Sequence, residues 1–347
     1  MSKEPALVKV YVNNQFKGDY PAFMHRQDLI DRGVCFAGGG FEIDASALIA
    51  FGDNNFRITD PDGSTLVGGE FQVSYRSAVL GEASILIGDL TEKKVGLFGN
   101  ARYARDTSIG TCMSKILHCI GIETVDDPVD DSADINLWHC FPHRQKPQGY
   151  SNTINFHLSD ISKSAIDKHH WTVFGRGVCV NPNDLNDDVR YVIKSEQNAA
   201  HDGRVKLGRD ITHDDTNGAV IQRLINNRNS ESTVLDLRVP VIGNDIPHVI
   251  LKTRSISNRF SNSNHSATVT RTENIFTAKE RSEILEFSRL VGLQYGELDV
   301  LRDADTGEIW IVDVNNTPAG PPNGLSQSDQ NAAIREQAIS FYSQFLK

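Results

Sequence analysis

The chain has 347 residues, about two domains' worth at roughly 150 residues per domain, so it can bury a core without help from disulfides. Its 35 Lys and Arg against 45 Asp and Glu give a formal charge of −10, which disfavours a broadly basic surface for nucleic acid or anionic lipid. The hydrophobic content of 39% and charged content of 23% are those of a globular protein and exclude disorder as the main state.

The five cysteines are scattered and include no CxxC pair, so they indicate neither a disulfide framework nor a zinc ribbon. The first residues, MSKEPALVKVYV, lack the basic start and the apolar run of roughly 7 to 15 residues that a secretory signal needs. No apolar stretch approaches the roughly 20 residues that span a bilayer. We therefore expect a cytoplasmic protein with reduced thiols and no membrane or nucleic-acid partner.

Residues 1–89 are predicted to form a β-rich N-terminal domain. The run VKVYV alternates in the manner of a half-buried strand, and Pro61-Asp62-Gly63 separates two further apolar runs as a turn does. Gly38, Gly39 and Gly40 lack the spacing of a phosphate-binding loop, which favours a flexible turn.

Residues 90–157 are predicted to form a small open α/β domain. VGLFG, which follows Lys94, is a strand candidate, Ser108 to Ile120 is a helix candidate, and Ile135 to Phe141 is another strand. The loop between the first strand and the helix carries Arg102 and Arg105, and it is either a ligand loop at the carboxyl end of a strand or a solvated loop.

The rest of the chain alternates strands with helices. Thr277 to Glu280 is a capping box that opens an amphipathic helix of about four turns, which Gly292 ends. GELDVLRDADTGEIWIVDVN then predicts a β-hairpin with its turn at Asp305-Thr306-Gly307. Apolar residues from Ile334 to Phe345 repeat at helical spacing, so the chain ends in a second amphipathic helix.

The hairpin predicts a magnesium site. Asp299 lies on its first strand, and Asp313 and Asn315, two residues apart, share a face of the second, so three oxygen ligands can converge. Magnesium usually takes only one or two carboxylates and completes its shell with water and substrate phosphates, which implies a bound nucleotide. The alternatives are an exposed acidic hairpin and an EF-hand, but Gly307 falls at position five of the calcium loop and no Glu stands at twelve.

The runs GELDVL and IWIVDVNNTPAGPP resemble the metal-binding hairpin of the ATP-grasp superfamily, in which an Asp on one strand is followed by Glu-x-Asn on the next. Asp313 replaces the usual Glu, which leaves open whether one ion or two are held, with Mn²⁺ able to replace Mg²⁺. The resemblance implies an α+β ATP-grasp domain over 158–347, with lobes of about 158–225 and 226–347 around a nucleotide cleft. Residues 90–157 would then be the preceding domain that binds the acceptor.

Upstream segments resemble the other ATP-binding motifs of the family in the right order. DISKSAIDKHHW offers Lys163 as the first phosphate-binding lysine, with Lys168 as the other register, and RYVIKSEQNAAHDG offers Lys194 as the second. Independently of the family, a lysine at a strand end before small residues suits a phosphate site. Such a lysine can also be a plain surface residue.

AVIQRLI resembles the strand that contacts adenine, so the implied contacts are backbone at Leu224 and Ile225 with Gln222 and Arg223 beside them. TVLDLRVPVIGNDIPHVILKTRS resembles the two strands that floor the cleft, and Asp236 and Arg238 match the first of them. Lys252 and Arg254 match the end of the second strand. Arg254 is predicted to face the transferred charge, with Arg259 in reserve; the alternative is that Arg238 and Arg254 are structural ion-pair residues.

His139 and His143 flank Cys140 with the spacing of zinc ligands on a helix, but Pro142 argues against a helix there and no third ligand is marked. The resemblance implies an ATP- and Mg²⁺-dependent ligase that joins a small-molecule carboxylate, activated as an acylphosphate, to an amine or similar nucleophile. A small-molecule kinase on the same fold and a nucleotide-binding module without turnover are the alternatives. The oligomeric state is open, with a homodimer as one option.

Overall fold

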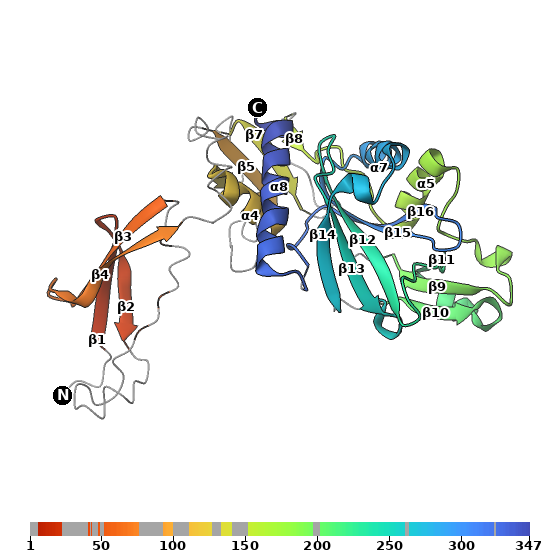
Figure 1. Cartoon of the computed structure of the whole chain (residues 1–347), viewed down its shortest axis with the longest axis horizontal. Helices are drawn as coiled ribbons and strands as arrows, with labels where there is room; N and C mark the ends of the chain where they lie inside the picture. Colours follow the sequence, from red (N-terminus) through yellow and green to blue (C-terminus); the bar gives the residue numbers. More distant parts are fainter. Residues whose placement is uncertain are drawn as a thin grey trace, which may run out of the picture. The chain divides into compact units, whose positions relative to one another are not determined.

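The computed structural model describes residues 6–22, 41, 43, 48, 52–75, 93–99, 111–126, 133–140, 152–196, 202–260, 264–322 and 324–347. The chain divides into two compact units, Met1–Gly81 and Glu82–Lys347. The mixed α/β class expected from the sequence is present, with separate sheets in each unit (Figure 1). Within the described residues, no helix has the length and apolar character needed to cross a membrane.

The first unit contains a four-stranded antiparallel sheet in the order β2-β1-β3-β4. Its strands are β1 (Ala6–Val12), β2 (Gln15–Ala22), β3 (Gly52–Thr59) and β4 (Thr65–Tyr75). Val10, Val12 and Phe56 are buried together on one face, because alternate residues of VKVYV point to the same side. Gly63 has a φ of +92° in the turn between β3 and β4, as the Pro-Asp-Gly signal predicts. Gly38 to Gly40 lie outside the described residues.

The second unit begins with a four-stranded parallel sheet in the order β6-β5-β7-β8. Its strands are β5 (Lys94–Gly99), β6 (Glu123–Asp126), β7 (Ile135–His139) and β8 (Thr153–Ile154). Helix α4 (Cys112–Ile120) lies between β5 and β6 in the chain and packs on α8 (Gln327–Phe345). The predicted strands and helix are confirmed where they are described; Ser108 and the loop with Arg102 and Arg105 lie outside the described residues.

The chain then forms a small antiparallel sheet in the order β10-β9-β11. Helix α5 (Lys163–Phe174) precedes its strands, which are β9 (Arg190–Ser195), β10 (Arg204–Leu207) and β11 (Ala219–Arg223). The short helix α6 (His213–Thr216) precedes β11. Lys206 Nζ lies 2.7 Å from Asp215 Oδ2, which links β10 to this short helix.

A five-stranded antiparallel sheet in the order β14-β13-β12-β15-β16 forms the largest part of the unit. Its strands are β12 (Thr233–Ile242), β13 (Val249–Ser255), β14 (Ser266–Thr270), β15 (Tyr295–Arg302) and β16 (Ile309–Asn315). One face of this sheet packs on α7 (Ala278–Val291) and α5 through a core that includes Leu237, Val239, Leu298, Val300, Ile311, Ile284 and Phe287. The charged residues of these strands are therefore left to the opposite face.

The predicted ends of α7 are confirmed. Thr277 Oγ1 accepts a hydrogen bond from Glu280 N at 3.2 Å, and Glu280 Oε2 accepts one from Thr277 N at 2.8 Å, which completes the capping box. Gly292 ends the helix at a φ of +83°, where a Cβ atom would lie 2.3 Å from the carbonyl oxygen of His157. Only glycine meets both demands at this position.

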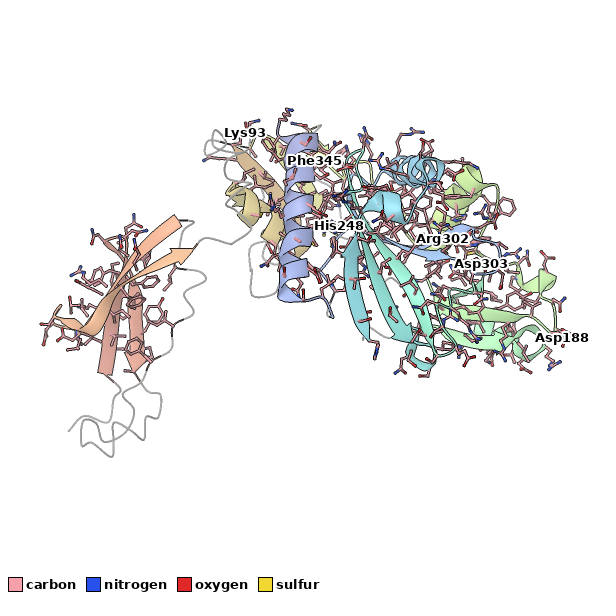
Figure 2. The ribbon with its side chains drawn as sticks, in the orientation of Figure 1. Lys93, Asp188, His248, Arg302, Asp303 and Phe345 are labelled. Atoms are coloured by element: carbon pink, nitrogen blue, oxygen red, sulfur yellow. The ribbon has the colours of Figure 1, made fainter. Side chains whose placement is uncertain are left out.

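The predicted hairpin and final helix are also confirmed, as β15 with β16 and as α8. Arg302, labelled in Figure 2, lies at the end of β15. It donates to Glu280 at 2.6 Å and so joins the hairpin to the start of α7. Lys93, just before β5, donates to the carbonyl of Leu346, which joins the parallel sheet to the end of α8.

Replacement of Phe287 by Ala is expected to lower the free energy of unfolding by about 3–5 kcal/mol, because the ring is fully buried in the core between α7 and the sheet. Urea unfolding followed by circular dichroism measures the change. Lys279→Ala, at a side chain 83% exposed on the same helix, is the control and should change the value by no more than about 0.5 kcal/mol. Equal effects of the two substitutions would contradict this packing.

Because His139 in β7 is buried, we expect the stability of the fold to decrease in acid. This residue is 1% exposed, neither ring nitrogen has a partner among the described residues, and burial lowers its pKa to about 4. The unfolded chain therefore binds a proton at His139 near pH 6.5, whereas the folded chain binds it only near pH 4. The free energy of unfolding falls as the pH drops from about 6.5 towards 4.

We expect His139→Leu to flatten the slope of unfolding free energy against pH in that window, by roughly 1–3 kcal/mol over its width. The exposed His265, replaced by Leu, is the control and should leave the slope unchanged. Urea titrations at several pH values give the slopes, and a slope unaltered in His139→Leu would show that another group carries the effect.

Candidate functional site

A cavity lies between the three-stranded sheet and the charged face of the five-stranded sheet. Residues of both sheets, of the start of α5 and of the segments after β11 and β13 form its wall. The lining residues are Lys163, Val192, Lys194, Asp202, Gly203, Gln222, Arg223, Leu224, Ile225, Asn227, Asp236, Arg238, Arg254, Arg259, Phe260, Asp299, Leu301, Val312 and Asp313. Ten of the eleven residues predicted for the site are among them; Asn315 is not.

A β-bulge in the hairpin brings two adjacent side chains into this cavity. Asp299 pairs with Asp313, but the next residue of β15, Val300, pairs with Ile311, so Val312 has no partner opposite it. Adjacent residues of a regular strand point to opposite faces, and an extra residue removes that constraint. Val312 and Asp313 therefore both line the cavity, while Ile311 and Val314 belong to the core behind it.

One end of the cavity is apolar. Ile225, Leu301 and Val312 line it there and rest on the buried side chains of Val178 and Trp310. Val192 and Leu224 are further apolar residues of the wall. A flat apolar group of the size of a nucleobase suits such a surface, since its faces need no hydrogen bonds.

The other end is charged, and Asp299 lies at its centre. Its carboxylate accepts hydrogen bonds from Lys252 Nζ at 2.9 Å and from Arg238 Nε at 3.2 Å. Burial opposes ionisation, but the charges of Arg238 and Lys252 outweigh it and hold the pKa of Asp299 well below its usual range. Asp299 is therefore ionised, and its two cations come from the neighbouring strands β12 and β13.

The carboxylates of Asp313 and Glu297 accept fewer hydrogen bonds than that of Asp299 among the described residues. Asp313 Oδ1 and both carboxylate oxygens of Glu297 are buried without a hydrogen-bond partner among the described residues, although Arg238 Nη1 lies 3.2 Å from Glu297 Oε2. Burial and the nearby charge of Asp299 raise the pKa of Asp313. Burial also raises the pKa of Glu297.

This donor set fits a magnesium ion, because buried carboxylate oxygens without protein donors are the ligands that a hard cation prefers. The described residues hold no group of three His, Cys, Asp or Glu side chains arranged for a metal, and the predicted set contains only two carboxylates, with Asn315 as its third member. Asn315 faces Glu297 across the hairpin, and its Oδ1 accepts a hydrogen bond from Thr317 N at 3.0 Å.

The two predicted lysines come together beside Asp313. Lys163 is the first residue of α5 and is 6% exposed, and its Nζ lies 3.4 Å from the carbonyl oxygen of Glu196, just after β9. Burial lowers the pKa of Lys194, and the charge of Lys163 adds to this, whereas Asp313 opposes it. Lys168, the other register, is exposed and does not line the cavity.

Arg238, Arg254 and Arg259 line the cavity, and Arg238 and Arg254 each form an ion pair. Arg254 Nη1 lies 2.6 Å from Asp236 Oδ2 and also donates to the carbonyl of Arg259 at 3.2 Å. Arg259, the reserve residue, donates to Asn227 Oδ1 at 2.6 Å. Arg238 joins Asp299 and Glu297. These pairings fix the guanidinium groups in place, as the structural alternative expected, and still leave them at the cavity wall.

The predicted base-contacting segment follows β11 along the apolar end. Gln222 is 3% exposed, and its Nε2 lies 3.8 Å from Cys179 Sγ. Arg223 N donates to Val178 O at 2.8 Å, and Ile225 O accepts from Arg259 at 3.2 Å. The backbone N–H of Ile225 and both backbone groups of Leu224 have no backbone partner among the described residues, so they are free to meet a base.

Sequence reasoning missed several residues of the site. Lys252 matched a strand motif but was not assigned to the site, and Glu297 was not considered, although both are buried next to Asp299. Gly203 and Phe260 face each other at the wall, where a Cβ atom on Gly203 would lie 2.8 Å from the ring. No local sequence signal marks these contacts, since each joins residues of different elements.

The zinc motif gains no support. His139 lies in a strand, not on a helix, and both of its nitrogens are buried without partners among the described residues. Cys140 is buried and packs on Trp138. His143 lies outside the described residues.

Similar solved structures are ATP-grasp ligases. The ATP-grasp ligase PsnB, complexed with a phosphomimetic variant of its minimal precursor, Mg and ADP, aligns with a TM-score of 0.48 and 11% identity over 74% of this chain and 99% of that chain. The macrocyclase MdnC with precursor peptide MdnA from Microcystis aeruginosa gives 0.43 and 12% over 73% and 99%. The D-alanine–D-alanine ligase from Bacillus anthracis complexed with ATP gives 0.43 and 14% over 73% and 97%.

These proteins come from the superfamily that the hairpin motif resembles. No family model and no curated protein matches the sequence.

Replacement of each hairpin aspartate by neutral Asn should change the free energy of unfolding differently in metal-free buffer. Asp299→Asn is expected to lower the free energy of unfolding by about 3 kcal/mol, because Lys252, 1% exposed, loses its carboxylate. The pKa of Asp313 is raised, chiefly by burial and by the charge of Asp299, so Asp313→Asn removes a disfavoured charge and should cause no loss. Urea unfolding in the presence of a chelator measures both, and equal losses would contradict the pairing described for Asp299.

Proposed function

We propose that the chain is an ATP- and Mg²⁺-dependent ligase of ATP-grasp type, which activates a carboxylate as an acylphosphate for attack by an amine or similar nucleophile. The observation that carries the proposal is one cavity whose wall has both an apolar part and a charged part. Residues from α5, β9, β11, β12, β15 and β16, far apart in the sequence, meet there in the arrangement that a base and a polyphosphate need.

The nucleotide base would lie at the apolar end, against Leu301 and Val312, and would hydrogen-bond to the backbone of Leu224 and Ile225. Its phosphates would then lie between the lysine pair and the hairpin aspartates. Among the lining residues cations outnumber carboxylates, so the cavity favours a polyanion although the whole chain is acidic.

Asp299 and Asp313, with Asn315, would hold Mg²⁺. When bound, the ion neutralises phosphate charge and orients the phosphates for transfer. The side chain of Asp313 is shorter than that of the usual Glu, so the site would hold either one ion or two. Mn²⁺ would be able to replace Mg²⁺ there.

In the reaction, Lys163 and Lys194 would hold the phosphate oxygens while the substrate carboxylate attacks the γ-phosphorus and ADP leaves. Arg254, oriented by its ion pair with Asp236, would stabilise the charge that develops on the transferred group, because a fixed guanidinium needs no reorganisation. The nucleophile would then attack the acyl carbon, and inorganic phosphate would leave as the new bond forms.

The acceptor would bind to the predicted α/β domain of residues 90–157, which precedes the predicted ATP-grasp domain of residues 158–347; both boundaries stay predictions. Structures of PsnB with precursor peptide PsnA2 and of MdnC with precursor peptide MdnA add peptides to the candidate substrates to be tested, along with small molecules. A cytoplasmic location and a homodimer also stay predictions.

The test is a screen of carboxylate and amine metabolites and acidic peptides for Mg-ATP-dependent release of ADP and phosphate, with mass spectrometry of the product. Lys163→Ala and Lys194→Ala are expected to reduce ADP formation about 100-fold or more, because each removes a charge from the phosphate site. Lys168→Ala, at an exposed lysine on the same helix, is the matched control and should retain activity.

Two results would favour another function over that of a ligase. Stoichiometric ADP with a phosphorylated product and no new covalent link between two substrates would identify a kinase. Mg-ATP binding without ADP formation for any acceptor would identify a nucleotide-binding module. Absence of Mg-ATP binding by the unaltered chain would show the proposal to be wrong.

A further inference from the structure

Asn227 is a buried amide in the segment that joins β11 to β12. It is 3% exposed, forms part of the cavity wall, and lies two residues after Ile225 of the base-contacting segment. Its Oδ1 accepts a hydrogen bond from Arg259 Nη2 at 2.6 Å, and the same nitrogen donates to Ile225 O at 3.2 Å. The amide oxygen is therefore tied to the base-contacting segment through Arg259.

The nitrogen of the same amide holds Asp236 on β12. Asn227 Nδ2 donates to Asp236 Oδ1 at 2.8 Å and to Leu235 O at 3.0 Å. An amide nitrogen carries two hydrogens, so both are in use. These bonds fix one oxygen of Asp236 and leave the other, Oδ2, to accept from Arg254 Nη1 at 2.6 Å.

Four residues of the cavity wall thus form a closed ring of hydrogen bonds. Arg254 Nη1 also donates to the carbonyl oxygen of Arg259 at 3.2 Å, and Arg259 is the residue that holds Asn227 Oδ1. All four members, Asn227, Asp236, Arg254 and Arg259, line the cavity. Because the ring contains two cations and one carboxylate, it keeps one positive charge beside the proposed polyphosphate.

The ring fixes the direction of Arg254. Its Nη1 bonds to Asp236 and to the carbonyl of Arg259, and its Nε donates to Asn264 Oδ1 at 3.1 Å. A guanidinium group is planar, so two held nitrogens also set the position of the third. Nη2 is the nitrogen of Arg254 to which the described residues give no hydrogen bond, and it is the one left for a ligand.

The ring requires a neutral side chain that both donates and accepts at position 227. A carboxylate there would place a second negative charge against Asp236, and a lysine would place a further positive charge against Arg259. An apolar side chain would remove the hydrogen bond to Asp236 Oδ1, and the carboxylate that holds Arg254 would lose one of its two partners.

We infer that Asn227 is a positioning residue, which aims Arg254 at the γ-phosphate through Asp236 and joins that arginine to the base-contacting segment. The inference rests on the proposed function, because that function places the base at Leu224 and Ile225 and the transferred phosphate at Arg254. Asn227 is buried and acts through Asp236 and Arg259, not on the nucleotide itself.

The test compares how the full chain binds Mg-ADP and the non-hydrolysable ATP analogue Mg-AMP-PNP, measured by isothermal titration calorimetry. The γ-phosphate is present in AMP-PNP alone, so the ratio of the two dissociation constants reports where Arg254 lies. Asn227→Asp keeps the shape of the side chain and is expected to weaken AMP-PNP binding at least about tenfold and ADP binding less than about threefold. General damage to the fold would weaken both nucleotides alike.

The matched control is Asn226→Asp, the same substitution one residue earlier. Asn226 Nδ2 donates to Asp305 Oδ1 at 2.9 Å in the hairpin turn, and neither residue lines the cavity. The control also places a new negative charge next to an aspartate, but it leaves the ring intact. It should bind the two nucleotides with the ratio of the unaltered chain.

Asn227→Ala adds no charge and is the second variant, which decides the test alone if Asn227→Asp folds poorly by circular dichroism. It should lower the preference for AMP-PNP in the same direction. In an Arg254→Ala background the same substitution should change the ratio no further, because the group that it positions is gone. An equal effect of Asn227→Ala with and without Arg254 would overturn the positioning role.

The outcomes separate the two proposals. An unaltered ratio in the Asn227 variants, in a chain that binds both nucleotides, overturns the positioning role alone, and so does a ratio that Arg254→Ala leaves unchanged. Failure of the unaltered chain to bind either Mg-nucleotide overturns the proposed function and, with it, this inference. A selective loss of AMP-PNP binding that depends on Arg254 supports both.

Discussion

Asp299 lies between two cations that come from neighbouring strands, and the site depends on this arrangement. Arg238 on β12 and Lys252 on β13 both reach its carboxylate, and Lys252 is 1% exposed. Charges this deep are tolerated only when each has a partner, so the register of three strands is tied to the pairing. A slip of one residue in β12 or β15 would move one partner to the apolar face.

The same constraint explains why the sheet has two unlike faces. Leu237, Val239, Leu298 and Val300 pack on α5 and α7, and the residues between them carry the charges. The bulge at Val312 adds the one departure from alternation, and through it an apolar residue and a carboxylate are both presented to the cavity. β15 and β16 therefore each supply an apolar and a charged residue to the cavity, Leu301 with Asp299 and Val312 with Asp313.

Several features of the fold could be predicted from short sequence patterns. The capping box at Thr277, the glycine stop at Gly292 and the alternation in the hairpin each depend on residues within a few positions of one another, and the structure has all three. Lys163 and Lys194 were placed by their order relative to the hairpin, and both line the cavity. The bulge, the contact of Gly203 with Phe260 and the burial of Glu297 carry no such local signal, because they arise from elements that meet only after folding.

The sequence by itself determined the hairpin, the helices α7 and α8 and the residue types that suit a metal and a polyphosphate, since periodicity and capping act between near neighbours in the chain. Only the tertiary structure decided which charges are paired. Lys252 and Asp299 are 47 residues apart and Arg238 and Asp299 are 61 apart, so their pairing follows from strand order and register. The same register left Asp313 Oδ1 and both carboxylate oxygens of Glu297 without hydrogen-bond partners in the described part of the chain.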